Sequence, residues 1–265
     1  VVATQKYRSR LPLKRTITIK QRLFRRCFCF QILRHDQHSS LTKYTMINRR
    51  PSPSYCMQST PSTDTTFTHT LVYDIRRSRY INLTSRCTLR CQFCPKHNGS
   101  KQVAEYDLTL SKTIHANDIL PLLGDVSAFE EYVFCGYGEP TLNLATLLTV
   151  AAELKQRGAK VRLNTDGLGN LFHRRNILPE LSKYIDAISI SLNADTEAAY
   201  IKHCQPKLPK AYAAVRDFIE LAPQYINSVS VSAINGLSEV NIEQCRQIAI
   251  NAGCHFTERQ LDIVG

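Results

Sequence analysis

From about residue 71 to its end, the sequence alternates between short strand-like runs and longer helical patterns. Strand-like alternation or buried-strand composition marks six runs: 79–84, 131–136, 159–165, 186–193, 227–235 and 254–260. Strands that alternate with helices form parallel sheets wrapped by helices. We therefore expect an α/β fold, a partial (β/α)6 TIM-like barrel of parallel strands. The chain is too short for eight βα units of ordinary size.

Three helical patterns lie between these strands, over residues 144–154, 215–222 and 242–252. Each repeats apolar residues at the spacing of one helix face, and a glycine follows the first and the third. Ser238 is the expected N-cap of the third helix, because a serine oxygen can accept from the first-turn amides. Asp195 is a candidate cap for the helix after residues 186–193.

Residues 1–69 differ from the rest of the chain. Residues 1–55 carry 13 Lys and Arg residues and one acid, Asp36, which accounts for the whole formal net charge of +12. We expect residues 1–69 to be a basic leader of low order and residues 70–265 to be the folded core domain. Three explanations of the leader stay open: a transit-like peptide, a basic arm for an anionic surface such as nucleic acid, or a non-native extension upstream of Met46.

The ten cysteines do not suit a secreted disulfide scaffold, because the amino-terminal region has no apolar signal segment. We expect reduced thiols and a cytoplasmic chain. We also expect no membrane span, since the longest apolar-looking stretch, residues 144–154, is far short of about 20 residues.

Polar segments follow the predicted strands at the same end of the sheet. "SRCTLRCQFC" follows the first, "GYGEPT" (136–141) the second, "NTDG" (164–167) the third and "SLN" (191–193) ends the fourth. Active sites of such folds lie at the carboxyl ends of the strands. This recurrence favours a site over coincidence.

Three cysteines stand within eight positions of the first of these segments, Cys87, Cys91 and Cys94, and His97 follows. Three thiolates on a short loop can bind three irons of a cubane cluster and leave the fourth iron open. The rival is a structural zinc site of the Cys3His type that includes His97. The residues alone leave both open, but zinc would explain nothing about the other strand ends.

The motif "CTLRCQFC" resembles the cysteine signature of radical SAM enzymes, and "GYGEP" is similar to their glycine–glutamate–proline motif. The wider set of motifs, including "VRLNTDGLGN" and "DAISISLNA", resembles the narrower TatD-associated radical SAM proteins. The resemblance runs from about residue 71 to the end. It implies a 4Fe–4S cluster and S-adenosylmethionine, whose reductive cleavage gives a 5′-deoxyadenosyl radical that abstracts hydrogen from a substrate.

Residue by residue, the resemblance makes the three cysteines the cluster ligands. It places the cofactor-binding residues at Gly136, Gly138, Glu139, Asn164, Ser191 and Asn193. Asp166 would face cofactor or substrate. A glycine at 138 would let the backbone approach the methionyl amine closely. Tyr137 stands where many relatives carry glycine, which predicts a stiffer loop.

Other polar and thiol residues have weaker assignments. Arg174 and Arg175 could clamp an anionic substrate or simply be solvated. A minor hypothesis gives Lys202, His203 and Cys204 a substrate role. Three further thiols are expected in the core: Cys135, Cys245 and Cys254.

The implied partners are an electron donor such as a flavodoxin or ferredoxin and an unknown substrate, which could be a peptide or other macromolecule. A functional link to a TatD-type hydrolase is a further expectation, and the loop 96–110 is a candidate lid. Two other functions compete: a zinc-stapled, nucleic-acid-binding module without catalysis, and a catalytically silent relative.

Overall fold

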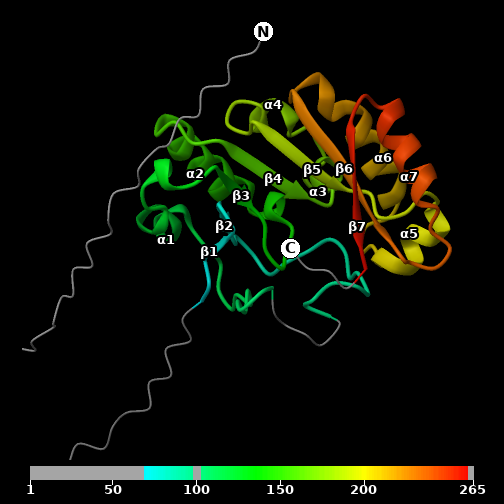
Figure 1. Ribbon diagram of the computed structural model, residues 1–265, viewed down its shortest axis with the longest axis horizontal. Coiled ribbons are helices and arrows are strands. Elements are labelled where there is room, and N and C mark those ends of the chain that lie inside the picture. The colour runs from blue at the N-terminus through cyan, green and yellow to red at the C-terminus, as the bar shows by residue number, and fades with distance from the viewer. Residues whose placement is uncertain (1–68, 98–102, 262–265) are drawn as a thin grey trace, which may run out of the picture. The chain divides into compact units, whose positions relative to one another are not determined.

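The computed structural model describes residues 69–97 and 103–261 of the 265-residue chain. Residues 1–68 of the predicted leader therefore lie outside the described residues. The described strands form one seven-stranded sheet in the order β1-β2-β3-β4-β5-β6-β7, which Figure 1 shows running across the molecule. The strands are β1 (Val72–Ile75), β2 (Ser78–Ile81), β3 (Glu131–Phe134), β4 (Val161–Thr165), β5 (Ala187–Ser191), β6 (Ser228–Asn235) and β7 (His255–Gln260).

Strands β2 to β7 are parallel, which confirms the six predicted parallel strands. Strand β1, which the sequence pattern does not predict, pairs antiparallel with β2. The turn between them contains Arg76 at φ 55°. Glycine or asparagine ordinarily marks such a turn, so residues 76–77 carry no hairpin signal.

Most strands are shorter than predicted. The first was expected over 79–84, but β2 ends at Ile81, and the second was expected to reach 136, but β3 ends at Phe134. The chain leaves the sheet earlier at these two points because it turns there into the two loops of the candidate site.

Helices fill the connections between the parallel strands. They are α1 (Ala116–Ile119), α2 (Leu144–Gln156), α3 (Gly169–His173), α4 (Leu178–Leu181), α5 (Glu197–Cys204), α6 (Ala211–Leu221) and α7 (Ile242–Asn251). The three predicted helices correspond to α2, α6 and α7. None of the helices in the described part of the chain has the length and apolar character that crossing a bilayer requires.

Two predicted helix caps are wrong. Asn241, not Ser238, caps α7, and its side-chain oxygen accepts from the amides of Glu243 and Gln244. Thr196, not Asp195, caps α5. The Asp195 carboxylate instead accepts from the backbone amide of Asn241, 2.9 Å away. Thr196 and Asn241 each directly precede the first residue of their helix, whereas the predicted caps lie one and three residues further back.

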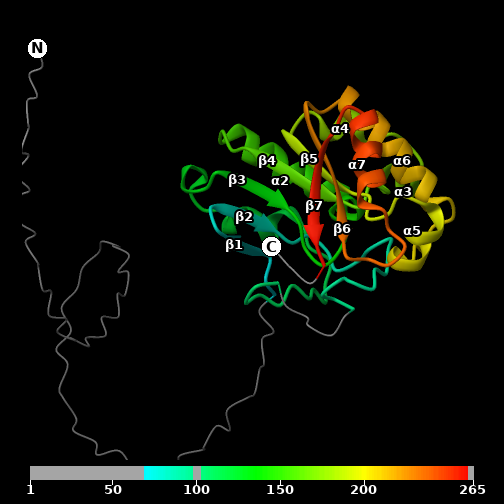
Figure 2. The ribbon, with the colours of Figure 1, turned by 45° about the vertical axis from the view of Figure 1, so that its right-hand side comes forward.

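The hydrophobic core lies on one face of the sheet. Side chains alternate along β4 and β5, so that Leu163 and Ile190 are buried while their neighbours are partly exposed. Leu147 of α2 and Phe218 of α6 are buried in the same core. Figure 2 shows α6 and α7 on the outer side of the β6 and β7 end of the sheet. On the opposite face, a small hydrophobic cluster of Tyr73, Leu108 and Tyr137 covers the end at β1 to β3, so the part along β4 to β7 is the one available to a ligand.

Candidate functional site

The three motif cysteines lie on the segment that follows β2, and all three are free and partly buried. Backbone hydrogen bonds fasten this cysteine loop, residues 85–97, to the end of α5. The amide of Arg90 donates to the Cys204 carbonyl at 2.9 Å, and the amide of Gln92 donates to the His203 carbonyl at 3.0 Å. Figure 2 shows the teal segment after β2 running to α5. The cysteine loop is thus held in place by α5, which lies more than 100 residues later in the sequence.

This docking replaces the substrate role considered for residues 202–204. His203 is buried, and its Nε2 lies 2.7 Å from the Ser238 carbonyl oxygen. Lys202 pairs on the surface with Glu239. Cys204 is buried beside Cys91 and hydrogen-bonds with its thiol. These residues brace the cysteine loop.

The electrostatics of the thiols suit a positively charged metal centre. Burial raises the pKa of Cys87 and of Cys94, and for Cys91 the hydrogen bond with Cys204 comes first and burial second. Thiols in such surroundings become thiolate ligands only when a metal replaces their protons. The Leu89 amide donates to the Cys87 sulfur at 3.5 Å, an arrangement that stabilises sulfur ligands. The donor set therefore fits a cluster.

The zinc alternative gains no support from the geometry. His97 is exposed, and its pKa is lowered first by desolvation and then by the cations of Lys96, Arg90 and Lys207. Among the described residues, no three Cys, His, Asp or Glu side chains converge as ligands of one ion. A cubane cluster does not need such convergence, since each thiolate binds a different iron.

Glu139 joins two strand ends. One carboxylate oxygen accepts from the hydroxyls of Thr141 and Thr165, each at 2.7 Å, and from the Thr141 amide at 3.0 Å. The other accepts from the Asp166 amide at 2.7 Å. Desolvation, followed by the charge of Asp166, raises the pKa of Glu139. The carboxylate is occupied within the protein, so any contact with a methionyl amine falls to the backbone of this loop.

Asp166 braces the cysteine loop from the opposite side. Its Oδ2 accepts a hydrogen bond from the Thr88 hydroxyl and lies 3.9 Å from the Cys87 sulfur, and its Oδ1 accepts from the Leu168 amide. The side chain is buried. The oxygens of Asp166 thus serve the loop that carries the thiols, and a contact of this residue with cofactor or substrate stays a prediction.

Gly138 is needed for a closer approach than the sequence indicated. A Cβ atom there would lie 2.3 Å from the carbonyl oxygens of both Thr84 and Arg86. The Glu139 amide donates to the same Arg86 carbonyl at 2.8 Å. The missing side chain therefore lets the "GYGEP" loop (136–140) lie against the start of the cysteine loop. The predicted reason, approach to a ligand, is not the contact that the structure shows. At Gly136, a Cβ would meet the side-chain oxygen of Asn82 at 2.1 Å.

Tyr137 anchors the segment after the cysteine loop. Its side chain is buried in a small cluster with Tyr73 and Leu108. The Leu108 carbonyl accepts from the Asn82 amide group at 2.8 Å, and the Leu110 amide donates to the Ser85 hydroxyl at 2.8 Å. Of the proposed lid, residues 96–110, the structure describes 96–97 and 103–110, and the second of these pieces is anchored by the buried side chains of Leu108 and Leu110.

The remaining predicted cofactor residues lie at the ends of β4 and β5. Asn164 accepts from Arg162 at 2.8 Å on the polar face of the sheet, and partly exposed Ser191 stands beside Ser232 of β6. Asn193 is buried at φ 62°, and its amide group donates to the Cys204 sulfur at 3.8 Å. The structure gathers all these residues at the carboxyl edge of the sheet.

Comparison with known proteins identifies the family. The family model of the radical SAM superfamily matches residues 81–250. The chain belongs to this superfamily. It is 33% identical over 119 residues to the pyruvate formate-lyase-activating enzyme of Staphylococcus aureus, covering 43% of this chain and 46% of that protein. It is 25% identical over 173 residues to the dual-specificity RNA methyltransferase RlmN of Buchnera aphidicola, covering 58% and 45%.

Solved structures agree on the fold. SuiB of Streptococcus suis, in a structure with its precursor peptide SuiA, shares 14% sequence identity at a TM-score of 0.53 over 72% of this chain and 40% of that one. The chain spans less than half the length of each of the curated relatives named here. Radical SAM enzymes use a 4Fe–4S cluster and S-adenosylmethionine, the two cofactors that the motifs implied.

Several secondary assignments in this radical SAM chain come out differently. Cys245 and Cys254 are buried in the core as predicted, but Cys135 is partly exposed just after β3 and faces Asn164. Arg174 ends α3 in a left-handed conformation. Arg175 pairs with Glu180 on the surface. Neither arginine lies among the strand-end residues.

One residue that the sequence analysis missed is Arg259 of β7. Its guanidinium donates to the side-chain oxygen of Asn193 at the same edge of the sheet. The available signal was the alternation of β7, which puts Thr257 and Arg259 on one side. The alternation alone does not show which face of the sheet lies toward the cysteines.

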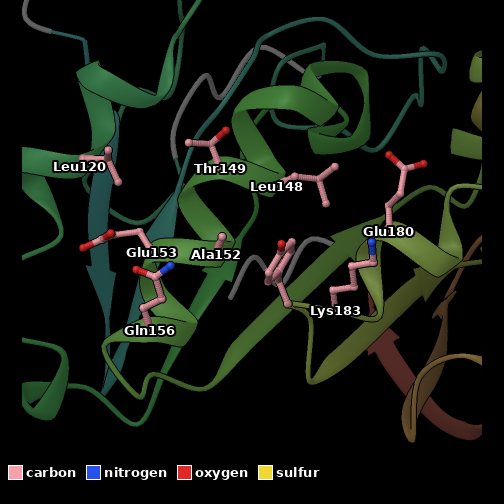
Figure 3. Close-up of a pocket in the computed structure, with 9 residues that line it drawn as sticks. Leu120, Leu148, Thr149, Ala152, Glu153, Gln156, Glu180 and Lys183 are labelled. Carbon is pink, nitrogen blue, oxygen red and sulfur yellow. The ribbon is translucent and has the colours of Figure 1, made fainter.

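A separate groove in the described part of this radical SAM chain lies away from the strand ends. It encloses about 550 Å³ on the helical layer between α2 and α4, and Figure 3 shows its labelled side chains. Leu148 of α2 lies on the side of Glu180 and Lys183, whereas the Glu153 side chain points toward the side of Leu120. None of the predicted site residues lines it, so we place the chemistry at the strand ends.

Proposed function

We propose that this chain is a radical SAM enzyme in which Cys87, Cys91 and Cys94 bind a 4Fe–4S cluster. The observation that carries the proposal is the fastening of the cysteine loop from two sides. The "GYGEP" loop packs on its first residues through Gly138, and the end of α5 receives its middle through backbone hydrogen bonds. A loop that must present three sulfurs to one cluster needs this restraint.

The cofactor residues act mainly through the backbone. In the proposal, the strand-end backbone of Gly136, Gly138 and Glu139 receives the methionyl amine, and Asn164, Ser191 and Asn193 line the remainder of the cofactor site. The Glu139 carboxylate keeps this loop fixed to the end of β4 through the Asp166 amide. When bound, the reduced cluster and S-adenosylmethionine supply the 5′-deoxyadenosyl radical that removes a hydrogen atom from the substrate.

The finer assignments are also proposals. The motifs support a place among the TatD-associated radical SAM proteins and a functional link to a TatD-type hydrolase. A flavodoxin or ferredoxin would reduce the cluster. SuiB, which shares the fold, is described with a precursor peptide, which supports a peptide or other macromolecule as substrate. The seven described cysteines are all free, which supports a cytoplasmic location.

Anaerobic reconstitution with iron and sulfide tests the proposal. We expect about four irons per chain, a broad visible absorption band, and formation of 5′-deoxyadenosine after reduction in the presence of S-adenosylmethionine. Stoichiometric zinc without a chromophore would favour the zinc-stapled module. A full cluster that never cleaves S-adenosylmethionine would instead identify a catalytically silent relative.

A further inference from the structure

On strands β4 to β7, the face of the sheet opposite the core carries mostly polar side chains, with Ala187 and the buried Ile234 as the apolar exceptions. Residues in register across neighbouring strands point to the same side, so a row of side chains can be followed from strand to strand. Two such rows cross this face: Asn164–Ser189–Ser230–His255, from β4 to β7, and Ser191–Ser232–Thr257, which runs from β5 to β7 and lies nearer the carboxyl ends. A row of hydroxyl and amide groups is suited to a polar ligand, since it offers donors and acceptors without filling the space.

Charge on this face is unbalanced. Of the residues that the described strands β2 to β7 direct to it, Glu131 is the one carboxylate. Arg162 neutralises that carboxylate with two hydrogen bonds, of 2.7 and 3.0 Å. Arg259 lies two positions beyond Thr257 on the same side of β7. Its charge therefore has no counterpart on the face that it shares with the hydroxyl rows.

Arg259 is held in place by one hydrogen bond, but its other hydrogen-bond donors are not all paired. One terminal nitrogen donates to the Asn193 side-chain oxygen, while the buried Nε has no hydrogen-bond partner among the described residues. No ion pair within the described chain includes this arginine; its neighbours are the thiols of Cys135, Cys91 and Cys204. Burial lowers the pKa of Arg259. Arg259 is partly buried, and a partly desolvated cation without a carboxylate partner is stabilised when an anion joins it.

We propose that Arg259 binds a carboxylate or phosphate group of the substrate, which would lie over the hydroxyl rows with its anionic end against β7. A guanidinium pairs with such oxyanions through parallel hydrogen bonds, and the free Nε is one donor of that fork. This inference rests on the proposed function, because it identifies the substrate class of the same site.

The carboxylate of S-adenosylmethionine is the other source of the same chemistry. The two sources differ in one measurable way. An anion that binds Arg259 in place of the cofactor's carboxylate must compete with S-adenosylmethionine, whereas an anion in a substrate subsite must bind alongside it.

The experiment uses the full chain with its cluster reconstituted and measures the affinity of two probes, inorganic phosphate and malonate, by calorimetric titration at constant ionic strength. We expect at least one probe to bind the parent chain and Arg259→Gln to weaken that probe at least about tenfold. Arg259→Lys should lose less, because it keeps the charge but not the fork. The matched control is Arg77→Gln, which removes an exposed arginine paired with Glu130. It should leave the affinity unchanged.

The outcomes separate cleanly. Saturating S-adenosylmethionine should leave probe affinity for the parent chain within about twofold, as expected for a distinct subsite. Competition would assign Arg259 to the cofactor and overturn the inference, as would equal affinity in the parent and in Arg259→Gln or no binding to the parent at all. The titration involves no radical chemistry. A chain that binds phosphate through Arg259 but cannot cleave S-adenosylmethionine would therefore refute the proposed function and not this site.

Discussion

The Oε2 atom of Glu139 lies 2.7 Å from the backbone nitrogen of Asp166, and Asp166 in turn accepts a hydrogen bond from Thr88. The loop after β3, the loop after β4 and the cysteine loop are therefore connected through two buried carboxylates. Three segments separated in sequence form one rigid unit at the carboxyl edge of the sheet.

The cysteines give the most direct prediction. Replacing Cys87, Cys91 or Cys94 by Ala should abolish cluster assembly, because a three-point site cannot form with two thiolates. Iron and sulfide content after anaerobic reconstitution is the measurement. Cys245→Ala is the control: this thiol is buried on α7, and its loss should leave iron content unchanged. Metal loss in His97→Ala as complete as in Cys94→Ala would support the zinc reading.

A side chain at Gly138 should disrupt both the cluster and the cofactor site. In Gly138→Val the first added carbon would lie 2.3 Å from two backbone carbonyl oxygens of the cysteine loop, so the loop must move. We expect loss of iron as well as loss of S-adenosylmethionine cleavage. Gly158→Ala provides the comparison, since a Cβ there meets nothing within 4 Å. It should cost about 1 kcal/mol for its positive φ and keep the cluster. Normal iron content in Gly138→Val would show that the loops can separate.

The Glu131–Arg162 pair predicts a pH dependence of stability. Arg162 lowers the pKa of Glu131 below its ordinary value of 4.5 through hydrogen bonding. A depressed carboxyl pKa stabilises the fold above the unfolded value, and this contribution is lost as the pH falls through the folded value. Glu131→Gln should therefore cost about 2 kcal/mol at pH 7, and the difference from the parent should shrink as the pH drops below 4.5. Urea unfolding at several pH values measures it. A difference that grows toward acid would contradict the assignment.

Removing the basic leader should leave the described fold and its chemistry intact. A chain that begins at His69 keeps the Thr70 carbonyl, which accepts from Asn82 at 3.0 Å beside the "GYGEP" loop. It also loses the excess positive charge, which lies entirely within residues 1–55. We expect unchanged iron content and S-adenosylmethionine cleavage. Failure to bind the cluster after this truncation would show that the leader contributes to the site.

Much of the fold could be predicted because hydrophobic periodicity and the residues that end helices and strands are local features of the sequence. Alternation along residues 186–193 and the helical period over 144–154 predicted β5 and α2 directly. The antiparallel β1 could not be predicted, since its turn at Arg76 lacks the usual residues. The cap at Asn241 depends on where the helix begins, which periodicity fixes only to within a few residues.

The site residues likewise fall into two groups, those that the sequence predicts and those that only the fold brings together. The cysteines and "GYGEP" form contiguous motifs, and their spacing carries their meaning. The importance of Arg259 depends instead on a contact with Asn193 across β6, and no local pattern records which strand ends meet. The close approach of Gly138 to the Thr84 carbonyl likewise depends on the fold, so the sequence could not predict it.

The one-sided core has a consequence for how this molecule can change over evolution. Helix packing stabilises the sheet from one face only, so substitutions at positions such as Leu163 or Ile190 should be purged for loss of folding. Ser189, Ser191 and Ser230 on the opposite face are only partly buried, and replacing them should leave the fold intact. Selection can therefore reshape the recognition surface almost independently of stability. A lineage could exchange one substrate for another through a few residues on β5, β6 and β7 while the cluster loop stays the same.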